Sequence, residues 1–198
     1  MNEEHKQRLK RLPPEFYRGH AWVHWIMAME NRRTGWLDAK LLYKFRELLT
    51  HAMFRYQLAC PIYCLMPDHM HLLWTGLAEQ SNQLTAMKTF RQDLNDTLSR
   101  IGVQLQVQAY DHVLQKDEIE IAAIESTAEY LARNPERKGL VEADAFVKYP
   151  FTGCLLPGAA RLRLFTEQGW DEIWRTLSFL KRTECFRIPD PKYAGDST

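Results

Sequence analysis

Two histidines separated by a single residue are the feature of the sequence that most clearly suggests chemistry. His69 and His71 flank Met70 and follow Pro67-Asp68 directly. On a β-strand, residues two positions apart project to the same face, about 6–7 Å apart along the backbone. Two imidazoles in this arrangement can chelate one divalent metal ion and leave room for water and a substrate oxygen. Two ordinary strand histidines would give the same pattern, so the pair alone does not establish a metal site.

A tyrosine and an asparagine four residues apart on a predicted helix form the second chemical feature. At this spacing Tyr130 and Asn134 face the same direction, so both could approach a metal held by His69 and His71. A tyrosine hydroxyl has a pKa of about 10 and is a weak nucleophile, but a nearby divalent cation can stabilise its developing charge. Asn134 could add a carbonyl oxygen to the metal shell. The alternative is a core tyrosine on an amphipathic helix, with a helix-ending asparagine before Pro135.

Other tyrosines and histidines offer competing interpretations. Four further tyrosines lack the Asn-Pro that follows the predicted helix of Tyr130: Tyr56, Tyr63, Tyr110 and Tyr149. His112 lies in a strand pattern beside Asp111 and could line a site, although a structural or surface role explains it equally well. His20 and His24 open the first predicted strand and show no obvious chemical role, although His24 could reach the sheet face beside the pair.

Positioning these residues requires a sheet and helices. Apolar runs and alternation predict strands at residues 20–29, 56–66, 69–75 and 103–114. Asp38 and Asp117 can cap the first and third of the helices that the periodicity predicts at residues 39–57, 81–100, 118–133 and 166–182. Pro61 should either distort the second strand or confine it to an edge. The element order fits an α+β fold, a ferredoxin-like split βαβ antiparallel sheet with helices on one face, plus an extra C-terminal helical segment.

The composition is that of an ordinary globular domain. The chain has 198 residues, of which 45% are hydrophobic and 26% charged, so wholesale disorder and collagen-like structure are excluded. Lys and Arg number 26 against 25 Asp and Glu, and this balance argues mildly against an obligate nucleic-acid binder. The sequence has no CxxC pair, no apolar signal-peptide core and no apolar run of about 18 residues. We therefore expect a reduced cytoplasmic protein with no membrane partner.

A family resemblance connects the two chemical features. Residues 66–74 read Met-Pro-Asp-His-Met-His-Leu-Leu-Trp and resemble the HUH motif of single-tyrosine transposases, in particular the REP-associated tyrosine transposases. Residues 129–141 read Glu-Tyr-Leu-Ala-Arg-Asn-Pro-Glu-Arg-Lys-Gly-Leu-Val and resemble the tyrosine helix of that family. Residues 108–113 and 148–152 resemble the strand before this helix and the segment after it. The resemblance therefore extends over about residues 20–155, in the order that the family shows.

The resemblance implies an enzyme, a metal-dependent single-stranded DNA endonuclease and strand transferase of DNA transposition or recombination. Tyr130 would attack the scissile phosphate, keep the 5′ end and release a 3′ hydroxyl. His69 and His71, with Asn134, would hold Mg²⁺ or Mn²⁺. The substrate would be single-stranded DNA with a hairpin, such as a REP-like palindrome, and the protein would act as a homodimer or alone. Two alternatives remain open: a catalytically silent hairpin-DNA-binding protein of the same fold, and a metal-dependent phosphodiesterase that uses water.

The charged, proline-containing start of the chain and the extent of the resemblance divide the chain into three parts. We expect a mobile or loosely packed arm at residues 1–19, a transposase-like catalytic domain at 20–155, and a partly helical extension at 156–198 to which the family assigns no role. Basic residues on two predicted helices are candidates for phosphate contacts, although a solvated helix face explains each one equally well: Lys88, Arg91, Arg133, Arg137 and Lys138. Affinity depends on local contacts rather than on net charge, so we expect a modest basic face and reliance on hairpin shape.

Overall fold

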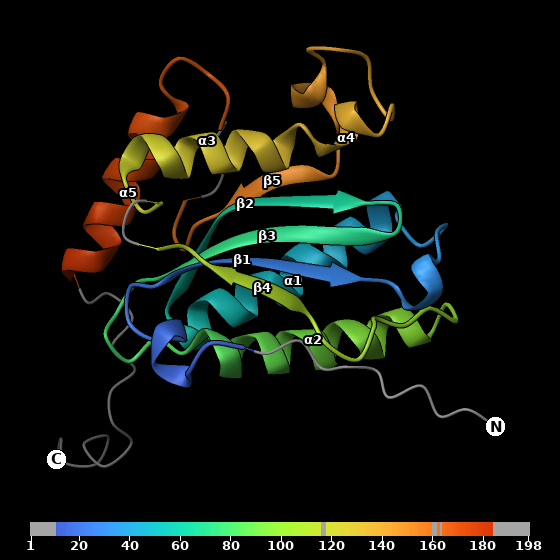
Figure 1. Ribbon diagram of the computed structural model, residues 1–198, viewed down its shortest axis with the longest axis horizontal. Coiled ribbons are helices and arrows are strands. Elements are labelled where there is room, and N and C mark those ends of the chain that lie inside the picture. Colours follow the sequence, from blue (N-terminus) through green and yellow to red (C-terminus); the bar gives the residue numbers. More distant parts are fainter. Residues whose placement is uncertain (1–10, 116–117, 160–161, 163, 184–198) are drawn as a thin grey trace, which may run out of the picture.

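The computed structural model describes residues 11–115, 118–159, 162 and 164–183, and its centre is an antiparallel sheet (Figure 1). The sheet has five strands in the order β4-β1-β3-β2-β5. The strands are β1 (Trp22–Ala28), β2 (Leu58–Met66), β3 (His69–Gly76), β4 (Tyr110–Val113) and β5 (Thr152–Leu155). The expected α+β fold with an antiparallel sheet is confirmed.

Helices connect and cover the strands, and two of them begin at side-chain caps. The α-helices are α1 (Ala39–Tyr56), α2 (Gln83–Ser99), α3 (Ile121–Ala132), α4 (Asn134–Arg137) and α5 (Gly169–Thr183). Three short 3-10 helices complete the list: η1 (Pro14–Tyr17), η2 (Glu30–Arg32) and η3 (Phe146–Lys148). The carboxylate of Asp38 accepts a hydrogen bond from the backbone N–H of Leu41 at 2.7 Å, and Asn82 caps α2 in the same way. Within the described residues, no helix is both long and apolar enough to cross a membrane.

One face of the sheet is covered by α1 and α2 and forms the larger apolar core (Figure 1). Phe90 of α2 packs edge-on against Phe45 of α1 and Trp74 of β3, with ring centroids 5.7 and 5.8 Å apart. All three rings are almost completely buried. Helices α1 and α2 thus cover one face of the sheet. The second core and the polar residues lie on the opposite face.

The opposite face carries α3 and α5, so the expectation of helices on one face holds for α1 and α2 only. Ile124 of α3 and Ile173 of α5 belong to one buried cluster with Ile62 of β2 and Leu73 of β3. The reason lies in the central strands, which are apolar on both sides and therefore need cover on both. Every residue of β2 is buried.

The region 103–114 forms a shorter strand than the sequence pattern predicts. Only Tyr110–Val113 pairs with β1 as a strand. Before it, the pairing continues as an isolated bridge between Leu105 and Met29, and side chains of α2 bond other backbone groups of the same stretch. Asn95 accepts from the N–H of Leu105 at 2.8 Å, and Arg91 donates to two backbone carbonyls of the same stretch. The sequence patterns do not predict β5, because Thr152–Leu155 lies in a stretch rich in Gly and Pro.

Pro61 lies in an interior strand, because β2 pairs with both β3 and β5. The register of β2 against β3 shifts between Ala59 and Ile62. Of the two expected outcomes, distortion of the strand is therefore the correct one. An irregularity is needed because proline has no N–H to donate to the ladder.

The described part of the N-terminal arm contacts β4 at two points, although residues 11–16 are exposed. Tyr17 is completely buried, and its hydroxyl donates to the carboxylate of Asp111. Arg11 also bonds this carboxylate, at 2.8 Å. Residues 1–10 and the expected cap Asp117 lie outside the described residues. The described arm from residue 11 onward is thus held by β4.

Candidate metal and nucleophile site

His69 and His71 project from β3 toward the face of the sheet that carries α3. Leu73, the next residue of this alternation, packs in the α3 and α5 core, whereas Met70 and Leu72 between them pack in the α1 and α2 core. The two side chains converge, with Nε2 of His69 3.0 Å from Nε2 of His71. The strand thus places both rings as the sequence pattern predicts.

Each histidine of the pair is held at its other ring nitrogen. Nδ1 of His69 lies 2.6 Å from Oδ1 of Asp68, and Nδ1 of His71 lies 3.0 Å from Nε2 of His24 on β1. A carboxylate can only accept, so Nδ1 of His69 carries the proton and Nε2 offers a lone pair. Carboxylate partners of this kind orient metal-binding histidines. The sequence analysis allowed that His24 could reach the sheet face beside the pair, and the pairing of β1 with β3 brings it to His71.

Burial keeps the inner histidines neutral. It lowers the pKa of His71 to about 3, with smaller contributions from His24, His69 and the positive charge of Arg137. Burial, and then His112, lower the pKa of His24 to about 4. At neutral pH both rings are therefore uncharged, and an uncharged imidazole has one ring nitrogen with a lone pair that can bind a metal.

The spacing of the pair fits a divalent metal ion. Two nitrogens that each lie about 2.1 Å from one ion, at adjacent corners of its shell, are about 3 Å apart, and Nε2 of His69 and Nε2 of His71 are separated by 3.0 Å. His24 approaches His71 from the Nδ1 side, so its nitrogen does not converge with the other two. In the described part of the chain, no group of three or more His, Cys, Asp or Glu is arranged to hold a metal. The protein therefore offers two imidazoles and leaves the other positions open.

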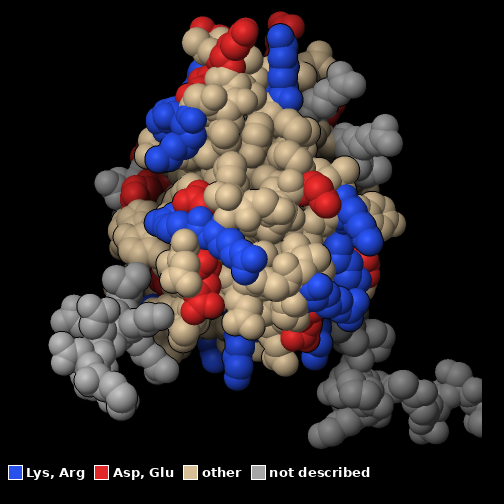
Figure 2. Space-filling view, turned by 90° about the vertical axis from the view of Figure 1, so that its right-hand side faces the viewer, with Lys and Arg blue, Asp and Glu red and all other residues tan. Residues whose placement is uncertain are grey.

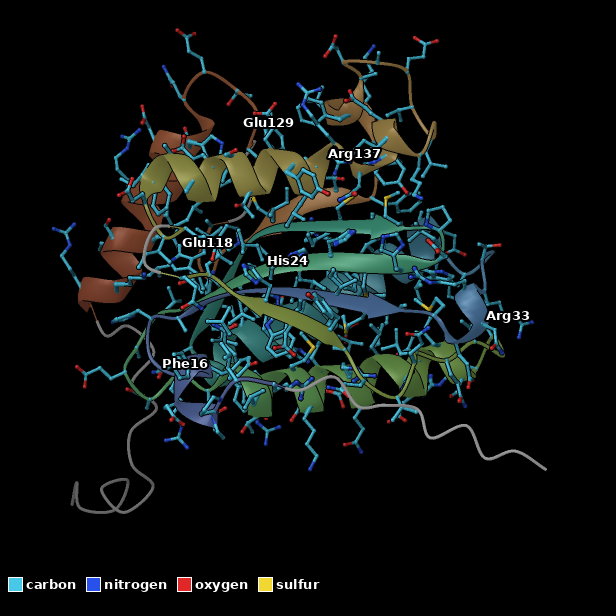
Figure 3. The ribbon with its side chains drawn as sticks, in the orientation of Figure 1. Phe16, His24, Arg33, Glu118, Glu129 and Arg137 are labelled. Carbon is cyan, nitrogen blue, oxygen red and sulfur yellow. The ribbon has the colours of Figure 1, made fainter. Side chains whose placement is uncertain are left out.

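Tyr130 lies on α3 above the same face and is 60% exposed. The guanidinium of Arg137 stacks on its ring, with the central carbon 3.9 Å from the ring centroid, and also donates to the Tyr130 carbonyl at 2.5 Å. The positive charge of Arg137 is also one of the smaller causes of the lowered pKa of His71. His24 and Arg137 lie on the side of the sheet toward α3 and α4 (Figure 3). The structure thus brings Tyr130 and the pair to one side of the sheet.

The expected continuous helix from Tyr130 to Asn134 is interrupted. Helix α3 ends at Ala132, and Asn134 begins the separate short helix α4. Pro135 lacks the N–H that would continue the helical ladder, which accounts for the break. Both amide atoms of Asn134 are engaged locally: Nδ2 donates to the Leu131 carbonyl at 2.9 Å, and Oδ1 accepts from Arg137 at 3.0 Å. A metal would have to replace Arg137 at this oxygen, so Asn134 as a ligand stays a prediction.

The competing tyrosines differ from Tyr130 in their surroundings. Tyr149 is buried and donates to the Leu65 carbonyl at 2.8 Å, and burial raises its pKa to about 12. Tyr63 is buried and bonded to Arg46 on the α1 side, and Tyr56 contacts Thr89 of α2. Only Tyr110 is comparably open, at 48% exposure, but it lies on the outer strand β4. Of these five tyrosines, Tyr130 is the one that is both exposed and located on the face of the sheet that carries the histidine pair.

The predicted phosphate-binding cations fall into three groups. Arg133 is bonded to Glu129, Glu136 and Asp144, so its charge is already balanced. Arg137 and Lys138 are exposed near Tyr130. The remaining two, Lys88 and Arg91, lie on α2, which covers the opposite face of the sheet from the histidine pair.

The surface near α4 shows the same mixture of charges. Figure 2 shows the end of the molecule with α4 and the turn between β2 and β3, where basic and acidic side chains are interspersed on an otherwise uncharged surface. Asp68 in this turn forms an ion pair with Arg32 of η2 at 3.2 Å. Two of the arginines of this region, Arg32 and Arg133, are thus paired with carboxylates.

Comparison with known proteins identifies the fold. No family model and no curated protein matches the sequence. Among solved structures, the chain is similar to a REP-associated tyrosine transposase bound to a REP hairpin, with a TM-score of 0.59 and 15% identity. The match covers 73% of this chain and 81% of that chain. This chain therefore has the α+β fold of a REP-associated tyrosine transposase.

Proposed function

We propose that the protein is a metal-dependent single-stranded DNA endonuclease and strand transferase that forms a 5′-phosphotyrosine on Tyr130. The observation that carries the proposal is the convergence of His69 and His71, whose Nε2 atoms are 3.0 Å apart, below a helix with an exposed tyrosine. Likeness in fold to a solved transposase supports the same chemistry.

The reaction requires a nucleophile that DNA can reach. The exposed phenol of Tyr130 meets this requirement. Its oxygen bonds to the scissile phosphorus, the bond from phosphorus to the 3′ oxygen breaks, and the phenol proton passes to water. The departing oxygen takes up a proton and leaves as a 3′ hydroxyl. The phosphotyrosine preserves the phosphodiester energy, so a second 3′ hydroxyl can reverse the exchange and rejoin the strand.

Residues around the tyrosine prepare the phosphate for attack. His69 and His71 would hold Mg²⁺ or Mn²⁺ through their Nε2 atoms, with Asn134 as the predicted third ligand. When bound, the ion would supply a Lewis acid that polarises the phosphate and stabilises charge on the attacking and leaving oxygens. Arg137, stacked on the Tyr130 ring, presents a guanidinium that can bind a phosphate oxygen.

The proposed substrate is single-stranded DNA that carries a hairpin. The solved transposase of similar fold is bound to a REP hairpin. The described surface near Tyr130 offers few unbalanced cations, because Arg133 is paired with carboxylates. Recognition by the shape of a folded DNA element requires fewer phosphate contacts than binding of random duplex does. A homodimer of the protein is compatible with this function and is open to test.

The test is a covalent adduct. Purified protein is incubated with end-labelled hairpin DNA and Mn²⁺, denatured and separated by gel electrophoresis. We expect a protein–DNA band with the wild type that is lost in Tyr130→Phe and in metal-free buffer. Tyr110→Phe is the matched control, because this second exposed tyrosine lies on the outer strand and should leave the band unchanged.

Two alternative outcomes define the competing functions. An adduct that persists in Tyr130→Phe would show that another residue is the nucleophile. Cleavage without any adduct would indicate a phosphodiesterase that uses water. Binding without cleavage in Mg²⁺ or Mn²⁺ would indicate a hairpin-binding protein that has kept the fold but not the reaction.

A further inference from the structure

Three imidazoles and one carboxylate form an uninterrupted hydrogen-bonded row. It runs from His24 on β1 through His71 and His69 on β3 to Asp68, with separations of 3.0, 3.0 and 2.6 Å. The rings of His24 and His71 are 5.2 Å apart and tilted by 30°. The function proposed above uses the two central rings, and His24 has so far no role.

The carboxylate of Asp68 lies at one end of the row and can only accept, so it determines the direction of every hydrogen bond in the row. Asp68 accepts, so His69 carries its proton on Nδ1 and has a lone pair on Nε2. Without a metal, His71 must therefore donate from Nε2 to His69. Its Nδ1 then has a lone pair and accepts from Nε2–H of His24. In this state His71 presents a proton, not a lone pair, to the metal position.

Metal binding requires the opposite tautomer of His71. Its Nε2 must present a lone pair, so its proton must sit on Nδ1 and be donated to Nε2 of His24. His24 in turn must carry its proton on Nδ1. No proton is gained or lost by the row, since the proton released from Nε2 of His71 is balanced by the one taken up at Nδ1 of His24.

We propose that His24 is a positioning residue that holds His71 in both tautomers and thereby lets it switch to its metal-binding form. This inference rests on the proposed function and adds a residue to it. His24 suits this task because a neutral imidazole can donate or accept at Nε2, depending on its tautomer. The antiparallel pairing of β1 with β3 fixes its place, with His24 opposite Leu73 and Ile26 opposite His71.

The first measurement reads the tautomers directly in the wild-type protein. Long-range ¹⁵N–¹H correlation spectra of the histidine rings distinguish a protonated nitrogen from one with a lone pair. We expect His71 to carry its proton on Nε2 in metal-free protein and on Nδ1 after Zn²⁺, a diamagnetic probe, is added. A proton that stays on Nε2, or metal bound by a ring nitrogen of His24 itself, would overturn the proposal.

The second measurement uses variants and Mn²⁺ binding followed by electron paramagnetic resonance. His24→Phe keeps a ring of similar size but has no hydrogen bond to offer, and should weaken Mn²⁺ binding 10–100-fold, as loss of an outer partner does. His24→Gln, which can donate or accept, should recover most of the affinity. The matched control is His112→Phe, since His112 is opposite His24 on β4 but bonds Glu118 instead. Equal Mn²⁺ affinity in wild type and His24→Phe would overturn the proposal.

The two proposals can fail separately. If Tyr130→Phe still forms the DNA adduct, the proposed nucleophile is wrong, while the tautomer change of His71 is unaffected. If the adduct depends on Tyr130 but His71 keeps one tautomer with and without metal, the role of His24 is wrong and the reaction stands. The spectra need no DNA and no catalytic turnover.

Discussion

The two faces of the sheet differ in the side chains that they carry. The face under α1 and α2 is a continuous apolar layer in which aromatic rings such as Phe45, Phe90 and Trp74 interlock. The opposite face is divided. At one end α3 and α5 form a second apolar cluster, and beside it His24, His69 and His71 form a polar row.

The same strands supply both faces, and alternation separates their tasks. Along β3, Met70 and Leu72 enter the continuous core, while His69 and His71 point to the divided face. The packing of the first face therefore fixes the spacing of the histidines on the second. A site built in this way on rigid strands holds its ligands more precisely than one built on loops.

The largest effect is expected in the continuous core. Phe90→Ala should lower the free energy of unfolding by about 3–5 kcal/mol, because it removes a buried ring and leaves a cavity. Urea unfolding followed by circular dichroism measures the change. Phe179→Ala is the control, since Phe179 on α5 is 54% exposed and its loss should change the free energy by about 0.5 kcal/mol or less. Similar losses for both variants would contradict the difference between core and surface.

Much of this core could be predicted from the sequence. The periodicity of α1 and α2 and the cap Asp38 gave elements close to those observed, because local propensity and burial agree there. The sequence did not predict the extent of β4 or the existence of β5, because both depend on contacts between residues distant in the chain. Before β4 the pairing with β1 is reduced to a bridge between Leu105 and Met29, which the alternation of residues 103–114 does not indicate. Strand β5 depends on pairing with β2 across a long stretch of chain.

A smaller effect is expected at the edge of the polar row. Asp68→Ala removes the acceptor that orients His69, and should weaken Mn²⁺ binding about 10–100-fold with little change in stability. Electron paramagnetic resonance of free Mn²⁺ measures the affinity. Arg32→Gln is the matched control, because it breaks the ion pair to Asp68 but leaves the contact with His69. If Arg32→Gln weakened metal binding as much, the effect would come from the turn and not from His69.

The candidate site could be predicted in part. The alternation of a strand was sufficient to place His69 and His71 on one face, and their convergence follows from this local geometry. The sequence indicated only that His24 could reach the sheet face beside the pair; its contact with Nδ1 of His71 depends on the register of two strands distant in sequence. For Asn134 the local pattern was misleading. Its spacing from Tyr130 predicted that both side chains lie on the same face of one helix, but the helix breaks before Asn134 and Arg137 bonds its amide oxygen.

The smallest expected effect is on the salt dependence of DNA binding. It tests whether Arg137, rather than the carboxylate-paired Arg133, contacts a phosphate. Arg137 stacks on the tyrosine and has no carboxylate among its hydrogen-bond partners in the described structure, whereas Arg133 bonds three carboxylates. If Arg137 contacts a DNA phosphate, Arg137→Gln should reduce the slope of log affinity against log salt by about 0.7–0.9. Arg133→Gln should leave this slope unchanged.

Fluorescence anisotropy with labelled hairpin DNA in metal-free buffer measures both slopes without cleavage. A reduction in Arg133→Gln equal to that in Arg137→Gln would mean that the carboxylates around Arg133 release it when DNA binds. The modest basic surface inferred for this face would then be wrong. An unchanged slope in both variants would place the phosphate contacts elsewhere, and Lys88 and Arg91 on α2 would be the next cations to replace, although they lie on the far side of the sheet from the histidines.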